Sequence, residues 1–399
     1  MNEIGTVGVL GAGTMGAGIA QVVAEARLTV LIHDPVEGAS ERARERIGGF
    51  LSRKAEKQQI SADDATVAMA RIRSVAGLED LADADLVIEA IPEDLELKRE
   101  AFKRLDARAA HTTVLATNTS SLSVAQIAGA TVRPERVIGM HFFNPVPLMA
   151  LVEVIAGPTT NPAVTDSIAL LARQLGKTPV VAADTPGFIV NRVQRAYYLE
   201  AFRIHEGGLA EVAAIDEAMR GLGFRLGPFE LADVVGTDVN LAAGLAIFDG
   251  FFGDVRFRPS QVQRRVVDSG RLGRKTGAGY YDYGTDGARG DPWAALAMTR
   301  LLPALDAPQI EARILASVVN EAASAVADGV AAPDAIDTAM RLATNWPDGP
   351  LAWSERIGLA SVVNTLDALH AVVPDGRYRV TPLLRALAES GGSFSSAWG

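Results

Sequence analysis

The chain has 399 residues, which is enough for two or three domains with sizeable hydrophobic cores. Its composition is globular, 48% hydrophobic and 22% charged, and its net charge of −10 argues against nucleic acid or an anionic membrane as a partner. The lack of cysteine excludes disulfides, thiolate chemistry and cysteine-based metal sites, and it suits a reducing, cytoplasmic compartment. We expect no metal site, no signal peptide and no membrane-spanning helix.

The N-terminal residues predict a strand–helix–strand unit with a glycine-rich turn. Residues 6–10 form a short apolar strand, and they lead directly into Gly11-Ala12-Gly13-Thr14-Met15-Gly16. An apolar helical stretch follows at 17–26, and a second apolar strand at 29–33 ends at Asp34. A glycine-rich motif in this order of elements is typical of dinucleotide binding, whereas the bare motif would fit any glycine-rich turn.

Each glycine of this turn has a separate physical role. Gly11 permits the tight turn, Gly13 lets the backbone approach a pyrophosphate, and Gly16 lets the helix pack closely on the strand. The helix N-terminus then offers unpaired N–H groups to the phosphates. Asp34 is placed to accept hydrogen bonds from a ribose 2′-hydroxyl and to repel a 2′-phosphate, so NAD is favoured over NADP.

Further short apolar runs predict a larger sheet. Helical patterns separate several of them, which indicates an α/β domain with a doubly wound, mostly parallel sheet. Two further helices, at 41–58 and 63–71, are expected as an inserted pair. The additional strands are predicted at 85–91, 113–117, 136–140, 151–155 and 178–182.

From Phe188 onward strand patterns disappear and helical runs dominate. We expect the dinucleotide-binding domain to cover residues 1–184 and a first helical domain to cover 185–284. A connector rich in Gly, Arg and Asp then leads to a second, degenerate helical domain at 292–399.

The two helical regions resemble each other as copies. Four landmarks of the first region recur in the second at an offset of 121 or, after one inserted residue, 122. Chance similarity between alanine-rich helices is the alternative, but the constant offset favours a duplication. The landmarks pair Glu200 with Glu321, Ile215-Asp216 with Ile336-Asp337, Gly227-Pro228 with Gly349-Pro350, and Gly236 with Gly358.

A histidine and a glutamate lie in consecutive predicted strands. His141 ends one strand, and Glu153 lies within the next. If these strands are neighbours, the carboxylate can hold one imidazole nitrogen and raise the basicity of the other. Such a pair is suited to remove the proton of an alcohol during hydride transfer. The alternative is a structural histidine, because Phe142 and Phe143 follow it directly.

Three further polar features are candidates for substrate contacts. Ser120 follows another predicted strand and can hydrogen-bond a substrate oxygen, although Ser120 or Ser121 can instead cap the helix near 124–128. Asn191 lies early in the first helix of the second domain, where its amide serves either the substrate or a buried backbone group. The basic stretch 42–57 is either a landing site for an anionic substrate tail or a solvated helix face.

Seven ordered segments together resemble the 3-hydroxyacyl-CoA dehydrogenase family over nearly the whole chain. The resemblance implies a Rossmann-like domain followed by two tandem all-α domains, similar to the C-terminal domain of 6-phosphogluconate dehydrogenase. The segments are GAGTMGAGIA (11–20), EAIPEDLELK (89–98), TNTSSL (117–122), GMHFFNPVP (139–147), LVEVI (151–155), DTPGFIVNR (184–192) and GRLGRKTGAGYYDY (270–283).

The resemblance also implies roles for individual residues. The catalytic pair of the family falls on His141 and Glu153, and its ligands of the substrate oxygen fall on Ser120 and Asn191. Its cofactor contacts fall on the glycine-rich turn and on Asp34, Glu93, Lys98, Asn144 and Lys275.

At the CoA end the resemblance is weaker. The CoA-binding lysine of the family corresponds to Lys57, and Ser120 is also expected on the substrate side. The family has a CoA-contacting serine in the same helical region, and Phe50 stands in its place here.

The resemblance implies that the second helical copy is structural, because Ala312 stands at the position equivalent to Asn191. Tandem copies in larger members pack as an internal pseudo-dimer, which we also expect here, with a homodimer of whole chains left open. The implied function is NAD-dependent oxidation of (S)-3-hydroxyacyl-CoA to 3-oxoacyl-CoA, or the reverse, by a stand-alone enzyme of acyl-CoA metabolism. Two alternatives are a dehydrogenase of a free hydroxy acid or sugar acid such as gulonate, and a non-catalytic NAD-binding protein.

Overall fold

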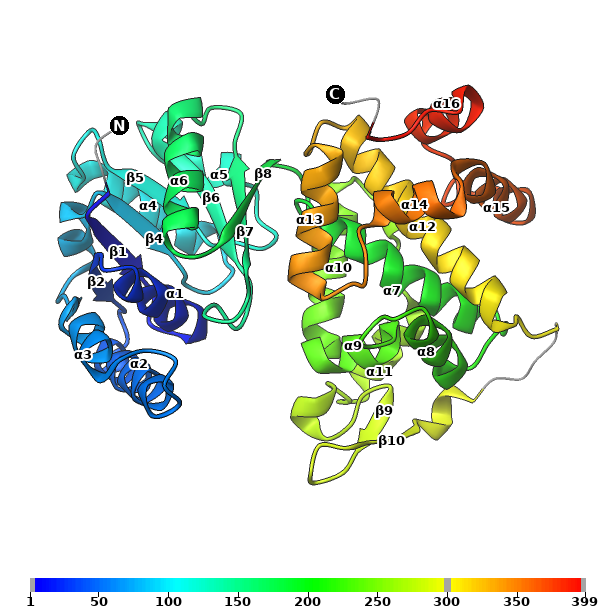
Figure 1. Ribbon diagram of the computed structural model, residues 1–399, viewed down its shortest axis with the longest axis horizontal. Helices are drawn as coiled ribbons and strands as arrows, with labels where there is room; N and C mark the ends of the chain where they lie inside the picture. Colours follow the sequence, from blue (N-terminus) through cyan, green and yellow to red (C-terminus); the bar gives the residue numbers. More distant parts are fainter. Residues whose placement is uncertain (1–3, 298–302, 396–399) are drawn as a thin grey trace. The chain divides into compact units, whose positions relative to one another are not determined.

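The computed structural model describes residues 4–297 and 303–395 (Figure 1). The chain divides into two compact units, of which the first ends at Phe188 and the second begins at Ile189. The first unit is built around a sheet with helices on both faces, and the second is largely helical.

The first unit contains an eight-stranded sheet in the order β3-β2-β1-β4-β5-β6-β7-β8. Neighbouring strands are parallel except β6 and β7, which are antiparallel. This confirms the prediction of a doubly wound, mostly parallel sheet, to which the short strand β3 is an unpredicted addition. The strands are β1 (Thr6–Leu10), β2 (Thr29–His33), β3 (Ile72–Ser74), β4 (Leu86–Glu89), β5 (Val114–Thr117), β6 (Val137–Phe142), β7 (Leu151–Ala156) and β8 (Thr178–Ala183).

Helices cover both faces of this sheet. Buried side chains of α1, α2, α3 and α6 form one hydrophobic core with the sheet, and those of α4, α5 and the 3₁₀ helix η1 form the other. The central strands β4, β5 and β6 are buried along their whole length and mostly apolar, as expected for strands that are covered on both faces. The helices are α1 (Thr14–Glu25), α2 (Ala39–Glu56), α3 (Ala62–Ala70), η1 (Leu78–Asp83), α4 (Leu95–Arg108), α5 (Val124–Ala128), η2 (Pro134–Arg136) and α6 (Pro162–Gln174).

The strand order reverses between β1 and β4. From β1 the chain proceeds to β2 and β3 on one side, whereas β4 leads to β5 and β6 on the other. Ligands of open α/β sheets bind outside the carboxyl ends of the strands at such a switch point. The loops after β1, β4, β5 and β6 share this edge of the sheet, and β7 begins there because it runs antiparallel to β6.

The second unit consists mainly of two successive sets of helices. The first set comprises α7 (Val190–Glu206), α8 (Val212–Gly221), α9 (Pro228–Val235), α10 (Thr237–Gly250), η3 (Val255–Phe257), α11 (Gln261–Asp268) and η4 (Arg274–Thr276). The second set comprises η5 (Ala294–Leu296), α12 (Ala307–Ala327), α13 (Pro333–Thr344), α14 (Pro350–Ile357), α15 (Leu359–Val372) and α16 (Pro382–Ser390).

A small antiparallel hairpin lies between these two sets. The strands β9 (Tyr281–Tyr283) and β10 (Arg289–Pro292) pair with each other, so the prediction that strands are absent after Phe188 was wrong. Segments of three and four residues are too short to give a periodic signal. The hairpin is instead fixed by a distant side chain, because Asp233 on α9 accepts the backbone N–H groups of Tyr280 and Tyr281 at 2.8 and 3.0 Å.

Repeated residues have the same structural role in both helical sets. Asp216 on α8 accepts two backbone N–H groups from the first turn of α9, at 2.9 and 3.0 Å, and Asp337 on α13 accepts two from the first turn of α14, at 2.8 and 2.9 Å. A Cβ on Gly227 would lie 2.3 Å from Asp216, and one on Gly349 would lie 2.2 Å from Asp337. Both glycines are therefore required by the same close approach, which supports the duplication.

In the part of the chain that the structure describes, no single helix is long and apolar enough to cross a membrane. The pair α9 and α10 passes that test together on length and composition, with a bend of 100° between the two helices.

The Asp216 carboxyl predicts a pH dependence of stability. Burial raises its pKa from the ordinary 3.8 to about 7, against the lowering effect of hydrogen bonds from Phe229, Tyr281 and Glu230. The folded state therefore binds the Asp216 proton more tightly than the unfolded state does. The protonated carboxyl contributes fully to the free energy of unfolding below the ordinary pKa, and this contribution is lost as the pH rises towards about 7.

Asp216→Asn cannot ionise, and it loses one acceptor oxygen at every pH. We expect its Tm to lie closer to the wild-type Tm at about pH 8 than at about pH 5. Thermal unfolding of both proteins at the two pH values checks this, and an equal Tm difference at both would contradict it. Asp367→Asn is the opposite control, because the hydrogen bond from Arg385 lowers the pKa of Asp367.

Candidate active site

The antiparallel pair β6 and β7 brings His141 and Glu153 together. The two residues are directly opposite in register, and Nδ1 of His141 lies 2.7 Å from Oε2 of Glu153. This confirms that the two strands are neighbours. Glu153 is fully buried and His141 is 6% exposed. An ionised carboxylate accepts a hydrogen bond, so it holds a proton on Nδ1 and leaves the Nε2 lone pair available to accept a proton from a substrate.

Two aromatic rings lie beside the imidazole of His141. The ring of Phe143 lies 4.5 Å from the ring of His141, and that of Phe188 lies 6.0 Å away, measured between centroids. The strand is also tied to its neighbour, since the backbone N–H of Phe142 donates to Oδ1 of Asn118 at 2.8 Å. These contacts restrict the orientation of His141 at the sheet edge.

The loop after β5 is organised by Glu93. Its Oε1 accepts hydrogen bonds from the Thr119 hydroxyl at 2.6 Å and from the backbone N–H groups of Ser120 and Ser121 at 3.0 and 3.1 Å. Burial alone would raise the pKa of Glu93, but Lys98 and these hydrogen bonds outweigh it, so the pKa is lowered. The carboxylate therefore stays ionised and orients the loop that carries Ser120.

The predicted alternative role of this loop as a helix cap was wrong. The cap of α5 is Ser123, whose hydroxyl accepts the backbone N–H of Gln126 at 3.3 Å. Ser120 and Ser121 lie one turn too early for that role, and both donate to Glu93 instead.

Lys98 lies inside the protein. Its side chain is 1% exposed, and the ammonium nitrogen lies 2.6 Å from Oε1 of Glu89 and 3.3 Å from Oε2 of Glu93. Burial raises the pKa of Glu89, which Lys98 and the Thr117 hydroxyl counteract. In this arrangement the charge of Lys98 acts on the Ser120 loop through Glu93.

The geometry of the glycine-rich turn fits a dinucleotide. Gly11 has φ +102°, and a Cβ there would lie 2.6 Å from the Ala90 carbonyl oxygen. A Cβ on Gly16 would lie 1.9 Å from the Gly11 carbonyl oxygen, so the helix could not pack as it does. A Cβ on Gly13 would meet no protein atom within 4 Å, and no side chain caps the helix at Gly13. The open space and the free helix N-terminus are the features that a pyrophosphate requires.

Asp34 adjoins this turn at the end of β2. Its two carboxylate oxygens accept the backbone N–H groups of Ala12 at 2.7 Å and of Val36 at 2.9 Å. Arg46 reaches the same turn from α2 and donates to the Ala12 carbonyl oxygen at 2.7 Å. Nothing in the sequence distinguishes Arg46 from the other basic residues of that helix, so this contact was not predicted.

The connection between β6 and β7 carries the exposed Asn144. Lys177, which is 8% exposed, donates to the carbonyl oxygens of Val146 at 2.6 Å and Met149 at 2.8 Å. It thereby braces the loop between the two strands that hold His141 and Glu153. The sequence offered no signal for this role, because a single lysine before a strand is usually solvated.

The basic stretch forms the exposed face of α2. Lys57 ends this helix and is exposed, whereas Ile47 and Leu51 face the core. Phe50 is 51% exposed, and the guanidinium of Arg53 lies 4.7 Å from its ring centroid. Phe50 and Arg53 thus form an aromatic and cationic surface at the position where the family resemblance implies a CoA-contacting serine.

Two predicted site residues belong to the second unit. Asn191 is the second residue of α7. Lys275, in η4, forms an ion pair with Asp238 at 2.7 Å, and its hydrogen bond lowers the pKa of that carboxyl.

Comparisons with known proteins agree with this geometry. The model of the 3-hydroxyacyl-CoA dehydrogenase NAD-binding domain matches residues 6–185, and that of the family's C-terminal domain matches residues 187–283 and 310–394. The first match includes the glycine-rich turn, and the cofactor is NAD. The second match covers both sets of helices.

The similar proteins include a dehydrogenase that matches nearly the whole chain and a shorter one that matches about 70% of it. The chain is 36% identical to 3-hydroxyadipyl-CoA dehydrogenase of Escherichia coli, over 98% of this chain and 99% of that protein. It is 43% identical to a probable 3-hydroxybutyryl-CoA dehydrogenase of Bacillus subtilis, over 70% of this chain and 98% of that protein.

Solved structures give the same result. A crystal structure of 3-hydroxybutyryl-CoA dehydrogenase from Escherichia coli covers 98% of this chain and 100% of its own, with a TM-score of 0.89 and 36% identity. The structure of (S)-3-hydroxybutyryl-CoA dehydrogenase from Ralstonia eutropha covers 71% of this chain and 100% of its own, with a TM-score of 0.69 and 40% identity. The chain is therefore an NAD-dependent dehydrogenase and belongs to the 3-hydroxyacyl-CoA dehydrogenase family.

Proposed function

We propose that this chain oxidises (S)-3-hydroxyacyl-CoA thioesters to 3-oxoacyl-CoA, or catalyses the reverse, with His141 as the catalytic base. The observation that carries the proposal is the buried 2.7 Å contact between His141 and Glu153 at the edge of the sheet. The glycine-rich turn leads from β1 to the same edge. The names of the similar proteins, which are dehydrogenases of 3-hydroxyacyl-CoA substrates, support the substrate class.

In the proposed mechanism Nε2 of His141 removes the proton of the 3-hydroxyl group, and Glu153 stabilises the imidazolium that forms. Ser120 donates a hydrogen bond to the substrate oxygen, and Asn191 supplies an amide to the same substrate. Bound NAD supplies the acceptor for the hydride from C3. In the reverse direction the imidazolium returns the proton to the alkoxide oxygen.

The groups proposed to hold the cofactor share the edge of the sheet or belong to the second unit. The turn from Gly11 to Gly16, with Thr14 and Met15, binds the pyrophosphate through backbone N–H groups. Asp34 binds the adenine ribose, and the remaining proposed contacts are Glu93, Lys98, Asn144 and Lys275. Lys57 is proposed to bind the CoA portion of the substrate from the exposed end of α2.

We also propose that the two sets of helices form an internal pseudo-dimer, with domains at 1–184, 185–284 and 292–399. Reciprocal ion pairs support it. Arg192 of the first set lies 2.7 Å from Glu321, and its counterpart Arg313 of the second set lies 2.6 Å from Glu200. An exchange of equivalent contacts is typical of a two-fold interface. Association of whole chains and the cytoplasmic location stay predictions.

Substrate assays test the proposal. We expect NADH-dependent reduction of acetoacetyl-CoA with kcat/KM of about 10⁴–10⁸ M⁻¹ s⁻¹, and far slower NAD-dependent oxidation of L-gulonate. The measurement is absorbance of NADH at saturating cofactor, extended over 3-oxoacyl-CoA substrates from about C4 to C16 to find the preferred chain length. Faster turnover of gulonate would favour a free hydroxy acid as substrate. NADH binding without turnover of any acyl-CoA would favour a non-catalytic NAD-binding protein.

A further inference from the structure

Arg192 is a fully buried arginine that follows Asn191 directly in the first turn of α7. Its Nε lies 2.7 Å from Oε1 of Glu321, and its Nη2 lies 3.1 Å from the Ser324 hydroxyl and 2.6 Å from Oδ2 of Asp328. All three partners belong to α12 or to its C-cap, in the second set of helices. A buried guanidinium is stable only when such partners compensate its lost hydration.

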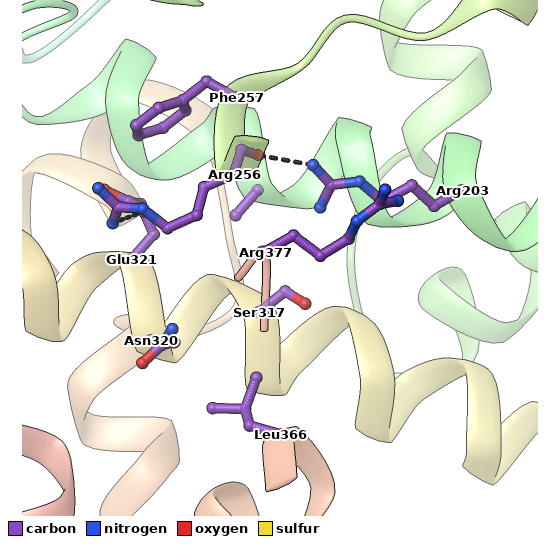
Figure 2. A pocket seen from close by; sticks show the side chains of 9 residues that line it. Arg203, Arg256, Phe257, Ser317, Asn320, Glu321, Leu366 and Arg377 are labelled. Atoms are coloured by element: carbon purple, nitrogen blue, oxygen red, sulfur yellow. Dashed lines mark hydrogen bonds and ion pairs between the residues drawn. The ribbon is translucent and has the colours of Figure 1, made fainter. Parts of the chain in front are cut away.

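The partners are themselves held in place. The second oxygen of Glu321 accepts a hydrogen bond from Arg256 at 2.9 Å, and Arg256 also reaches Ser324 at 3.2 Å. Figure 2 shows Arg256 directed at Glu321, beside a cavity of about 20 Å³, which has room for one water molecule. The position of Glu321 is therefore fixed from both sides, by Arg192 and by Arg256.

The duplicated chain contains a counterpart to this arrangement. Arg313 occupies the position equivalent to Arg192, one residue after Ala312, and its guanidinium contacts Glu200 at 2.6 Å and the Tyr378 hydroxyl at 3.2 Å. Its side chain is 15% exposed, compared with 1% for Arg192. The arrangement is thus repeated, but with fewer oxygens and more solvent around Arg313.

The difference between the two arginines comes from two residues of the second copy. The positions equivalent to Ser324 and Asp328 in the first copy are Arg203 and Gly207, which offer no side-chain oxygen. The second copy, in which Ala312 replaces the asparagine, therefore supplies Arg192 with two acceptors, Ser324 and Asp328, that the first copy does not supply to Arg313.

We infer that the second helical copy positions Asn191 for the reaction, by holding Arg192 through Glu321, Ser324 and Asp328. Arg192 is a positioning residue, and the inference rests on the role proposed above for Asn191. Three oxygens bind the guanidinium of Arg192 and so fix the rotation of the first turn of α7 about the helix axis. This rotation also sets the direction in which the side-chain amide of Asn191 points. The degenerate copy then contributes to turnover, beyond its contribution to stability.

Arg192→Lys and Arg313→Lys form a matched pair for the test. Each keeps the positive charge but removes the planar guanidinium and its several hydrogen bonds between the two copies. Both variants are therefore expected to lower the Tm. We expect Arg192→Lys to lower kcat for acetoacetyl-CoA reduction about 10- to 100-fold, because small misplacement of a substrate-binding group has effects of that size. Arg313→Lys should change kcat less than about 2-fold, and the KM for NADH should stay within about 2-fold in both.

Repeating the Arg192 substitution in a protein that already carries Asn191→Ala distinguishes a loss of kcat through misplaced Asn191 from a loss through general destabilisation. If Arg192 acts through Asn191, adding Arg192→Lys to Asn191→Ala should change kcat by less than about 2-fold. Asp328→Asn serves as a milder second variant, because the Asp328 side chain is 48% exposed and only one hydrogen bond is altered. We expect it to lower kcat about 3- to 10-fold in the wild-type background, and not in the Asn191→Ala background.

Three results would overturn the inference. The first is an equal loss of kcat in Arg192→Lys and Arg313→Lys, and the second is a loss that persists in the Asn191→Ala background. The third is wild-type kcat in Asn191→Ala itself, which would also remove Asn191 from the mechanism. Failure of the proposed function is distinct from all three, because the wild-type protein would then not reduce acetoacetyl-CoA.

Discussion

Replacing His141 by alanine is expected to lower kcat for acetoacetyl-CoA reduction by about 10²- to 10⁴-fold, the usual contribution of a general acid or base. Alanine removes the only group that we propose to exchange a proton with the substrate oxygen. The glycine-rich turn is not altered, so the KM for NADH should stay close to the wild-type value. Steady-state kinetics with varied NADH and acetoacetyl-CoA measure both quantities.

Two further variants sharpen this test. Glu153→Gln keeps the size of the side chain but removes the charge that stabilises the imidazolium, so it should also lower kcat strongly with little effect on the KM for NADH. His111→Ala removes an exposed histidine outside the site and should leave kcat unchanged. Near-normal turnover of His141→Ala would remove this residue from the mechanism.

The second large effect is expected at Gly13. Its φ of −67° is accessible to alanine, and a Cβ there would meet no protein atom within 4 Å. Gly13→Ala should therefore fold with an unchanged Tm in the absence of cofactor. Its methyl group would occupy the space of the pyrophosphate, so we expect the Kd for NADH to rise at least about tenfold, equivalent to about 1.4 kcal/mol.

Fluorescence titration with NADH measures the Kd, and the rise of Tm on adding NADH gives an independent readout. Gly49→Ala is a matched control on the exposed side of α2, since a Cβ there also meets nothing within 4 Å. Gly16→Ala is the contrasting variant, because its Cβ would lie 1.9 Å from the Gly11 carbonyl oxygen and should lower the Tm without any ligand. Wild-type affinity in Gly13→Ala would contradict the placement of the pyrophosphate.

Local sequence was sufficient for the features that depend on neighbouring residues. The glycine-rich turn, the apolar strands and the helical repeat follow from short-range patterns and from a constant offset, and the structure contains all of them. The partnership of His141 with Glu153 needed one further condition, that their strands be neighbours, and the pairing of β6 with β7 meets it.

Other features needed contacts between distant segments. Ser120 and Ser121 have the composition of a helix cap, but Glu93, almost thirty positions earlier, binds their backbone and leaves the cap to Ser123. The hairpin of β9 and β10 has no periodic signal, and it depends on Asp233 of α9.

The sequence by itself determined the dinucleotide-binding turn, the class of sheet and the duplication of the helices, because each depends on the spacing of residues along the chain. Only the tertiary structure decided which charged groups are buried together. Lys98 with Glu89, Lys177 with two loop carbonyls, and Arg192 with three oxygens of α12 and its C-cap are examples. The reason is energetic: a charged side chain is normally solvated, and it enters the interior only where the fold brings compensating partners from remote parts of the chain.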